Sequence, residues 1–159
     1  MDFSAERVIA EAELLPLIRE RLAQGQSVRY LPFKGISMLP LLRQGKDSVE
    51  LSPLPDKLKK YDLPVYQYSS GKIVMHRIVR VEGNHYVCLG DNTYEYEYIK
   101  PDQLIGLVTA IKRGEKRISV DACGYRVYSR VWCALFPLRR LYKRAKGWLR
   151  RRLKWINHL

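Results

Sequence analysis

Three polar residues of this chain are of the types that together activate a hydroxyl group for attack on a carbonyl. They are Ser37, His76 and Asp91, in that order along the sequence. A serine hydroxyl is a poor nucleophile at neutral pH and needs a base within hydrogen-bond reach. A histidine titrates near neutrality, so it can take the serine proton and return it to a leaving amine. We therefore predict Ser37 as nucleophile and His76 as base, with Asp91 fixing the imidazole tautomer.

The surroundings of these residues make the combination more specific than its parts. Ser37 lies in the segment Gly35-Ile36-Ser37-Met38-Leu39-Pro40, His76 lies within an apolar segment, and Asp91 lies in a Gly-Asp-Asn sequence. Taken singly, each has a common structural interpretation: a serine before a turn, a satisfied core histidine, and ordinary turn chemistry. Asp91 in particular could equally brace a loop. The order and the local context favour a catalytic site.

The elements expected to position these residues are mainly β-strands. Residues 4–24 carry apolar residues at helical spacing and end at Gly25, which predicts an amphipathic helix with Pro16 as a point of kinking. Beyond it, short apolar segments alternate with turn sequences, and those around Gly83-Asn84 and Gly114 are typical of hairpins. The expected strands are Ser27–Phe33, Ser48–Leu51, Leu63–Tyr68, Lys72–Val81, His85–Leu89, Leu104–Lys112 and Arg117–Val120. We predict a mainly β fold, a small antiparallel barrel or folded sheet.

Residues 122–159, called the basic tail below, have a different composition. All 16 acidic residues lie at or before Asp121, where 18 basic residues offset them to +2, whereas the basic tail holds 11 Lys and Arg and no acid. Apolar residues recur three or four apart along the tail, which predicts an amphipathic helical region that Pro137 divides into two helices. The sequence thus divides into an N-terminal helix (1–25), a β domain (26–121) and the basic tail.

Such a tail fits three roles. We rank binding to an anionic membrane surface first, packing on the β domain second and binding to nucleic acid third. An apolar side that includes tryptophans suits a lipid surface, and it exceeds what phosphate contacts require. The residues predicted to bind the membrane are Trp132, Arg139, Arg140, Lys143, Arg144, Trp148, Arg151 and Trp155.

Four segments, in order, resemble the boxes of the signal-peptidase-like serine peptidases, a grouping that includes self-cleaving repressor proteases. Residues 35–40 resemble the nucleophile box, and residues 61–66 resemble the strand that follows it. Residues 75–79 (Met-His-Arg-Ile-Val) resemble the box that supplies the base, and residues 90–92 with 103–108 resemble the closing box. Histidine in the base position resembles the histidine-using branch, where most bacterial relatives carry lysine.

The resemblance implies Ser37 as nucleophile, His76 as base and Asp91 as the nearby acid, with Glu95 and Glu97 as alternative acids. It implies a mostly antiparallel β-structure with a shallow groove, where a peptide would lie extended along a strand edge. The nucleophile box comprises Gly35, Ile36, Met38 and Pro40 with Ser37. Relatives often carry an oxyanion-binding hydroxyl where this chain has Gly35, so backbone N–H groups of this box, including that of Ser37, are expected to bind the oxyanion.

Composition restricts the function classes further. The three cysteines are not arranged as a zinc or redox pair, so we expect free thiols and neither metal nor cofactor. No signal peptide or spanning segment is evident, which predicts a cytoplasmic protein, peripheral on the inner membrane face. The expected function is that of a serine endopeptidase acting on a peptide or precursor protein. The alternative is a catalytically degenerate peptide-binding module whose tail binds a membrane or nucleic acid.

Overall fold

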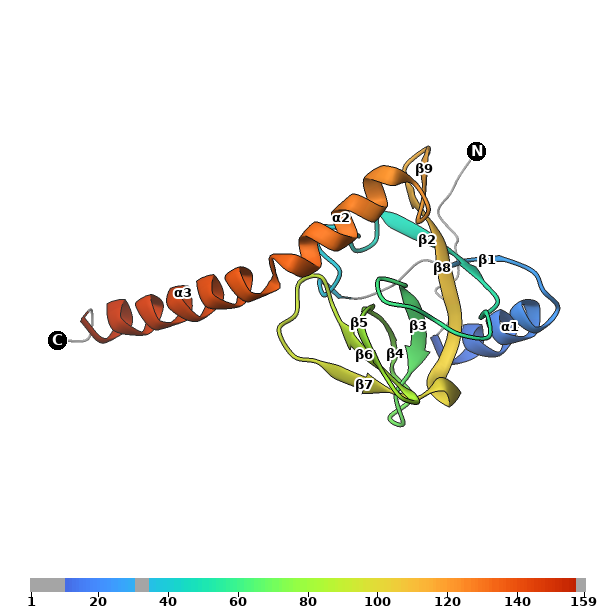
Figure 1. Cartoon of the computed structure of the whole chain (residues 1–159), viewed down its shortest axis with the longest axis horizontal. Coiled ribbons are helices and arrows are strands. Elements are labelled where there is room, and N and C mark those ends of the chain that lie inside the picture. Colours follow the sequence, from blue (N-terminus) through green and yellow to red (C-terminus); the bar gives the residue numbers. More distant parts are fainter. Residues whose placement is uncertain (1–10, 31–34, 157–159) are drawn as a thin grey trace.

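A computed structural model describes residues 11–30 and 35–156 of the chain. The strands form two antiparallel sheets, so the expected mainly β fold is confirmed (Figure 1). The described strands leave both sheets open, so they do not form the closed barrel that was one of the two expected forms.

The larger sheet has six strands and the smaller has three. The larger runs in the order β1 (Val28–Tyr30), β2 (Asp47–Ser52), β8 (Leu104–Arg113), β3 (Pro64–Gln67) and β4 (Ile73–Met75), with β9 (Lys116–Ser119) also paired to β8. The smaller contains β5 (Arg77–Glu82), β6 (His85–Leu89) and β7 (Glu97–Ile99), and a 3-10 turn, η1 (Pro101–Gln103), precedes β8.

Both predicted hairpins are present. β5 and β6 meet at the pair Glu82–His85 and leave Gly83-Asn84 as the two-residue loop. In the same way β8 and β9 meet at Arg113–Lys116 around Gly114. The first residue of each loop is a glycine with positive φ, +54° at Gly83 and +59° at Gly114, and glycine at this position favours the tight hairpin turns that match the right-handed twist of the strands.

The strand predicted over Lys72–Val81 is two strands, divided at His76. β4 pairs with β3 in the larger sheet, whereas β5 pairs with β6 in the smaller one. The chain therefore passes from one sheet to the other at His76, which is only 4% exposed. A periodicity of two continues through such a crossing, so the apolar pattern alone does not reveal it.

Of the three described α-helices, two lie against the sheets and the third extends away from them (Figure 1). α1 (Glu11–Ala23) buries Leu15, Ile18 and Leu22 in the core of the larger sheet and contains Pro16; residues 4–10 of the expected helix lie outside the described residues. α2 (Cys123–Ala134) lies against the β domain, and α3 (Phe136–Ile156) extends away from it (Figure 1). Pro137 is the second residue of α3, as predicted. No described helix is both long enough and apolar enough to cross a bilayer.

Candidate active site

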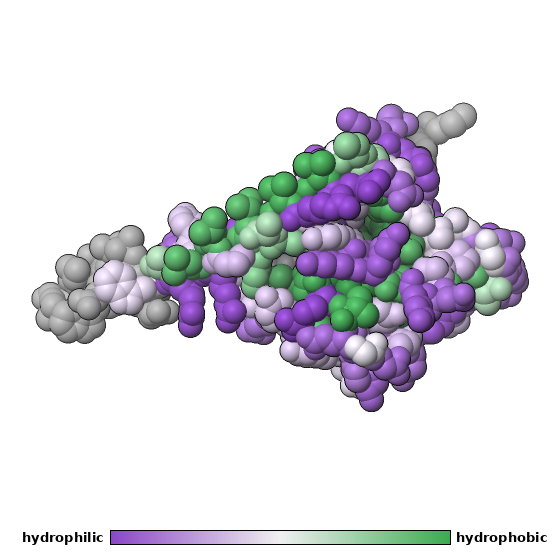
Figure 2. Space-filling model, viewed as in Figure 1, coloured by the Kyte–Doolittle hydropathy of each residue, from purple (hydrophilic) through white to green (hydrophobic). Residues whose placement is uncertain are grey.

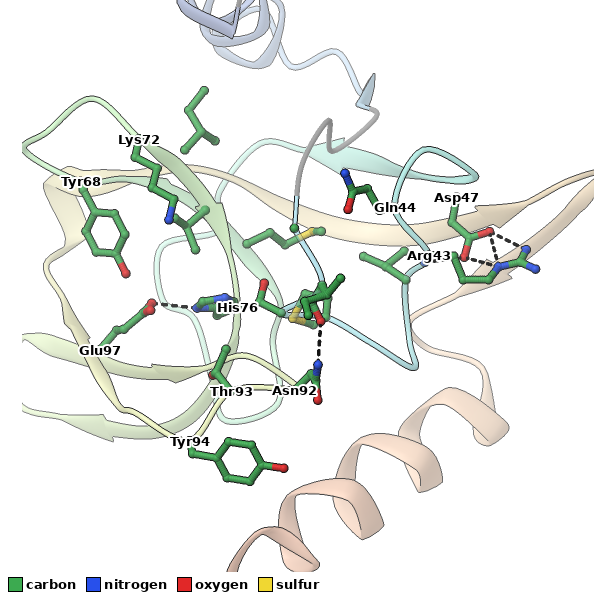
Figure 3. Close-up of a pocket in the computed structure, with 18 of the residues that line it drawn as sticks. Arg43, Gln44, Asp47, Tyr68, Lys72, His76, Asn92, Thr93, Tyr94 and Glu97 are labelled. Atoms are coloured by element: carbon green, nitrogen blue, oxygen red, sulfur yellow. Dashed lines mark hydrogen bonds and ion pairs between the residues drawn. The ribbon is translucent and has the colours of Figure 1, made fainter. Parts of the chain in front are cut away.

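A pocket of about 680 Å³ brings together residues from both sheets and from the basic tail. Ser37, His76 and Glu97 all line it, and Glu97 lies beside His76 (Figure 3). Asn92 and Tyr94 line it from the segment between β6 and β7. The predicted nucleophile and base therefore share one cavity.

His76 is held on one ring nitrogen by a carboxylate. Its Nδ1 lies 2.8 Å from Oε2 of Glu97 (Figure 3), and the hydroxyl of Tyr66 donates to the same oxygen. The Tyr66 hydroxyl also lies 3.2 Å from Nδ1. An ionised carboxylate can only accept, so the Nδ1 proton points at Glu97 and Nε2 carries the lone pair. That is the tautomer a general base requires.

Opposing effects act on the Glu97 carboxyl. Burial alone would raise its pKa, but hydrogen bonds from His76 and Tyr66 outweigh burial and lower the pKa below the usual 4.5. Burial and the bond to Glu97 also raise the pKa of Tyr66, which remains a donor. Because the folded-state pKa is lowered, these bonds stabilise the protein fully above pH 4.5, and the contribution is lost as the pH falls through the lowered value.

The nucleophile box forms a turn that leaves Ser37 partly exposed between an exposed Ile36 and a buried Met38. The turn is closed by the Leu39 N–H, which donates to the carbonyl of Ile36 at 3.2 Å. Gly35 has φ +123°, a backbone conformation that residues with a Cβ rarely adopt. A side chain that could supply an oxyanion hydroxyl is therefore disfavoured at this position. Within the described part of the chain, the Ser37 N–H has no hydrogen-bond partner.

The closing segment contacts the nucleophile box through its backbone. The Asn92 N–H donates to the Ser37 carbonyl at 2.6 Å, and Asn92 Nδ2 donates to the Ile36 carbonyl at 3.1 Å. A Cβ on Gly90 would lie only 2.8 Å from the Ser37 carbonyl oxygen, so this close approach requires glycine. Residues 90–92 thus position Ser37.

The predicted contact between Asp91 and His76 is not formed. Both carboxylate oxygens of Asp91 bond to Arg77, at 2.8 and 2.9 Å, and the Tyr128 hydroxyl donates to one of them. Arg77 also donates to the hydroxyls of Tyr125 and Ser129 on α2. Asp91 therefore fastens α2 to the β domain, and Glu97, weighed as an alternative, is the carboxylate on the imidazole.

Two residues predicted to bind a membrane instead help to hold the basic tail on Asp91 of the β domain. Trp132 Nε1 and Arg139 Nη1 both donate to the Asp91 carbonyl, and the Arg139 guanidinium lies 4.2 Å from the centre of the Trp132 ring. They hold the tail on the domain. Of the other predicted tail residues, Arg140, Lys143, Arg144 and Trp148 are exposed, and the side chains of Arg151 and Trp155 lie outside those described.

Transfer of the Ser37 hydroxyl proton to His76 would require a hydrogen bond between Ser37 Oγ and Nε2 of His76. Between the described residues Ser37 and His76 there is no hydrogen bond, and Nε2 of His76 is a buried acceptor with no partner among the described residues. In a free enzyme such bonds are often formed only when substrate binds. The thiol of Cys88 does not take the place of Ser37 as a nucleophile. It is fully buried, and burial raises its pKa to about 12, so it stays protonated.

Three residues that line or support this pocket, Tyr66, Lys72 and Lys146, were not predicted as site residues. Lys143, which also lines it, was predicted only for the membrane surface, and Glu97 was only an alternative acid. Glu97 lies two residues before Ile99, which is buried on β7, so strand alternation places both on the inner side. That spacing was the available signal for Glu97.

Among the described residues, no three His, Cys, Asp or Glu side chains gather in a way that could hold a metal ion. No protein-family model matches the chain, and a comparison with curated proteins found no match.

Proposed function

We propose that the chain is a serine peptidase that uses Ser37 as nucleophile, His76 as general base and Glu97 as the residue that orients the base. One observation carries the proposal: Glu97 holds Nδ1 of His76 and leaves Nε2 without a described partner, in a pocket that Ser37 also lines. A buried acceptor without a partner is costly in a folded protein, and a serine proton would satisfy it.

The reaction follows from these positions. Ser37 Oγ bonds to the carbonyl carbon of the substrate while Nε2 of His76 accepts the hydroxyl proton. The C–N bond then breaks, and the same proton leaves on the amine. A water molecule next gives a proton to Nε2 while its oxygen bonds to the acyl carbon. The bond from that carbon to Ser37 Oγ then breaks, and Oγ takes the proton back from Nε2, which releases the acid and restores the Ser37 hydroxyl. Throughout, Glu97 stabilises the imidazolium, and the Ser37 N–H is available to the oxyanion.

A fluorophosphonate probe tests the nucleophile without knowledge of the substrate. The full chain should become labelled, and mass spectrometry should place the label on Ser37. Ser37→Ala should remove the label, whereas the matched variant Ser70→Ala, in an exposed turn, should keep it. Labelling that persists in Ser37→Ala would exclude the assignment. Absence of labelling in the unmodified chain would favour the peptide-binding module.

The basic tail suggests where this peptidase works. A stripe of large apolar side chains, each 39–67% exposed, runs along α2 and α3, with three- or four-residue spacing from Val127 to Leu141 (Figure 2). Its described members are Val127, Val131, Leu135, Leu138, Leu141, Tyr142 and Trp148. Packing on the β domain does not cover these residues, and soluble surfaces rarely present so long an apolar row. We infer that the stripe lies on an anionic membrane surface, with the flanking Lys and Arg near the lipid headgroups.

Vesicle sedimentation tests this location. The full chain should bind vesicles of equal parts phosphatidylcholine and phosphatidylserine, and salt should weaken the binding. Leu138→Glu with Leu141→Glu should reduce partitioning by about 10-fold or more, because two apolar side chains no longer enter the lipid. Val81→Glu, which changes an exposed valine of β5, is the matched control. Equal partitioning of all variants would contradict a role for the stripe.

A further inference from the structure

The pocket that holds Ser37 and His76 carries an uncompensated positive charge. Three lysines line it: Lys72, Lys143 and Lys146. Together with Arg43, the lining holds four Lys and Arg against two carboxylates. Asp47 pairs with Arg43 at 2.7 Å, and Glu97 lies 2.8 Å from His76, so the lining keeps a net positive charge even with a neutral imidazole. Within the described part of the chain, no carboxylate forms an ion pair with any of the three lysines. An anionic group entering the pocket would therefore be attracted from several positions.

The lysines lie at two ends of the pocket, with His76 between them. Lys72 and Tyr94 lie on opposite sides of His76 (Figure 3). Lys143 belongs to the Tyr94 end, because its Nζ lies 4.0 Å from the centre of the Tyr94 ring. Lys146 follows one turn later on α3, with its Nζ 5.9 Å from the Tyr142 ring.

The first turns of α3 fix the Tyr94 end. Phe136 is buried, and its ring packs on those of Tyr94 and Tyr96, with centroids 6.2 and 5.5 Å apart. One turn later, Arg139 bonds to the Asp91 carbonyl. Lys143 is one turn beyond Arg139, so the contacts of Phe136 and Arg139 hold its backbone at the pocket edge, and its Nζ lies over the Tyr94 ring. The basic tail thus contributes a wall of the pocket as well as an exposed stripe.

We propose that the pocket selects peptides that carry Asp or Glu on both sides of the bond to be cleaved. This inference rests on the proposed peptidase function and specifies its substrate class. An extended peptide running from Lys72 past His76 to Lys143 would place acidic side chains at the two positive ends. Each carboxylate would pair with a lysine that no described carboxylate occupies, and the pairs would discriminate against basic peptides through repulsion.

Binding to the full-length Ser37→Ala protein tests this without any cleavage. Three fluorescent peptides of equal length would carry Asp and Glu, the matching Asn and Gln, or Lys at the same positions. By fluorescence anisotropy, we expect the acidic peptide to bind about 10-fold more tightly than the amide peptide, since two partly exposed ion pairs multiply their separate effects. Added salt should reduce this difference.

Charge-reversal variants locate the effect. Lys72→Glu and Lys143→Glu, each combined with Ser37→Ala, should remove most of the preference for the acidic peptide. Lys116→Glu, an exposed lysine on β9 outside the pocket, should leave it unchanged. Equal binding of the acidic and amide peptides, or an equal effect of Lys116→Glu, would overturn the proposal. So would a Lys143→Glu effect confined to anionic vesicles, because the lysine would then serve lipid. A failure of phosphonate labelling would leave these binding results unchanged, so the two proposals fail separately.

Discussion

Replacing Glu97 by Gln is expected to slow phosphonylation of Ser37 by roughly 10²- to 10⁴-fold, the range associated with loss of a correctly oriented general base. The carboxamide can donate an N–H to Nδ1 of His76, which moves the ring proton to Nε2. Nε2 then cannot accept the Ser37 proton. The measurement is the second-order rate of labelling by a fluorophosphonate, with circular dichroism and thermal unfolding as checks on the fold.

Glu95→Gln is the matched control, because Glu95 is an exposed carboxylate two residues away on the same segment. It should label at the unmodified rate. If Glu97→Gln also labels at that rate, Glu97 does not orient the base. If Asp91→Asn instead loses labelling while its thermal unfolding is unchanged, the original assignment of Asp91 as the supporting acid would be restored.

Replacing Asp91 by Ala is expected to lower the free energy of unfolding by about 3–5 kcal/mol, as found when one partner of a buried ion pair is removed. The side chains of Arg77 and Asp91 are 0% and 2% exposed, so the guanidinium would be left charged and buried. It would keep its bonds to the neutral hydroxyls of Tyr125 and Ser129, which cannot balance a full charge. Urea unfolding measures the loss.

Glu50→Ala serves as the comparison, because it breaks the pair with Arg117, whose side chain is 54% exposed. Exposed pairs contribute little, so this variant should be far less destabilised. Equal destabilisation by the two substitutions would contradict a structural role for Asp91. The double variant Arg77→Met, Asp91→Leu should recover part of the stability, since no unpaired charge remains.

The sequence predicted the site best where a residue's neighbours in the chain determine its surroundings. The hairpin loops and the division of the tail at Pro137 are local features, and they were predicted at the right places. His76 was predicted to lie in the middle of a strand, but its position depends on which partner each half of that strand pairs with. Strand pairing is a long-range property, which a pattern of apolar residues does not contain.

The choice between Asp91 and Glu97 shows the same limit. Both are acidic residues downstream of His76, and the Gly-Asp-Asn sequence made Asp91 the more conspicuous. What separates them is Arg77, the residue next to His76, whose side chain pairs with Asp91 while the imidazole meets Glu97. His76 lies at the crossing between β4 and β5, whereas Arg77 begins β5, and the two side chains meet different partners. Only the three-dimensional arrangement shows which acid lies on which side.

The three residues 90–92 join two parts of the molecule that a domain diagram would draw separately. On one side their backbone holds the turn of Ser37, and on the other Asp91 holds α2 through Arg77, Trp132 and Arg139. A truncation of the basic tail would therefore remove the Asp91 contacts of Tyr128, Trp132 and Arg139 and loosen the turn that holds Ser37, so a loss of the proposed activity in such a protein would say nothing about lipid. The tail is not a detachable module, and point substitutions on its outer stripe are the proper way to separate the proposed membrane contact from the proposed cleavage.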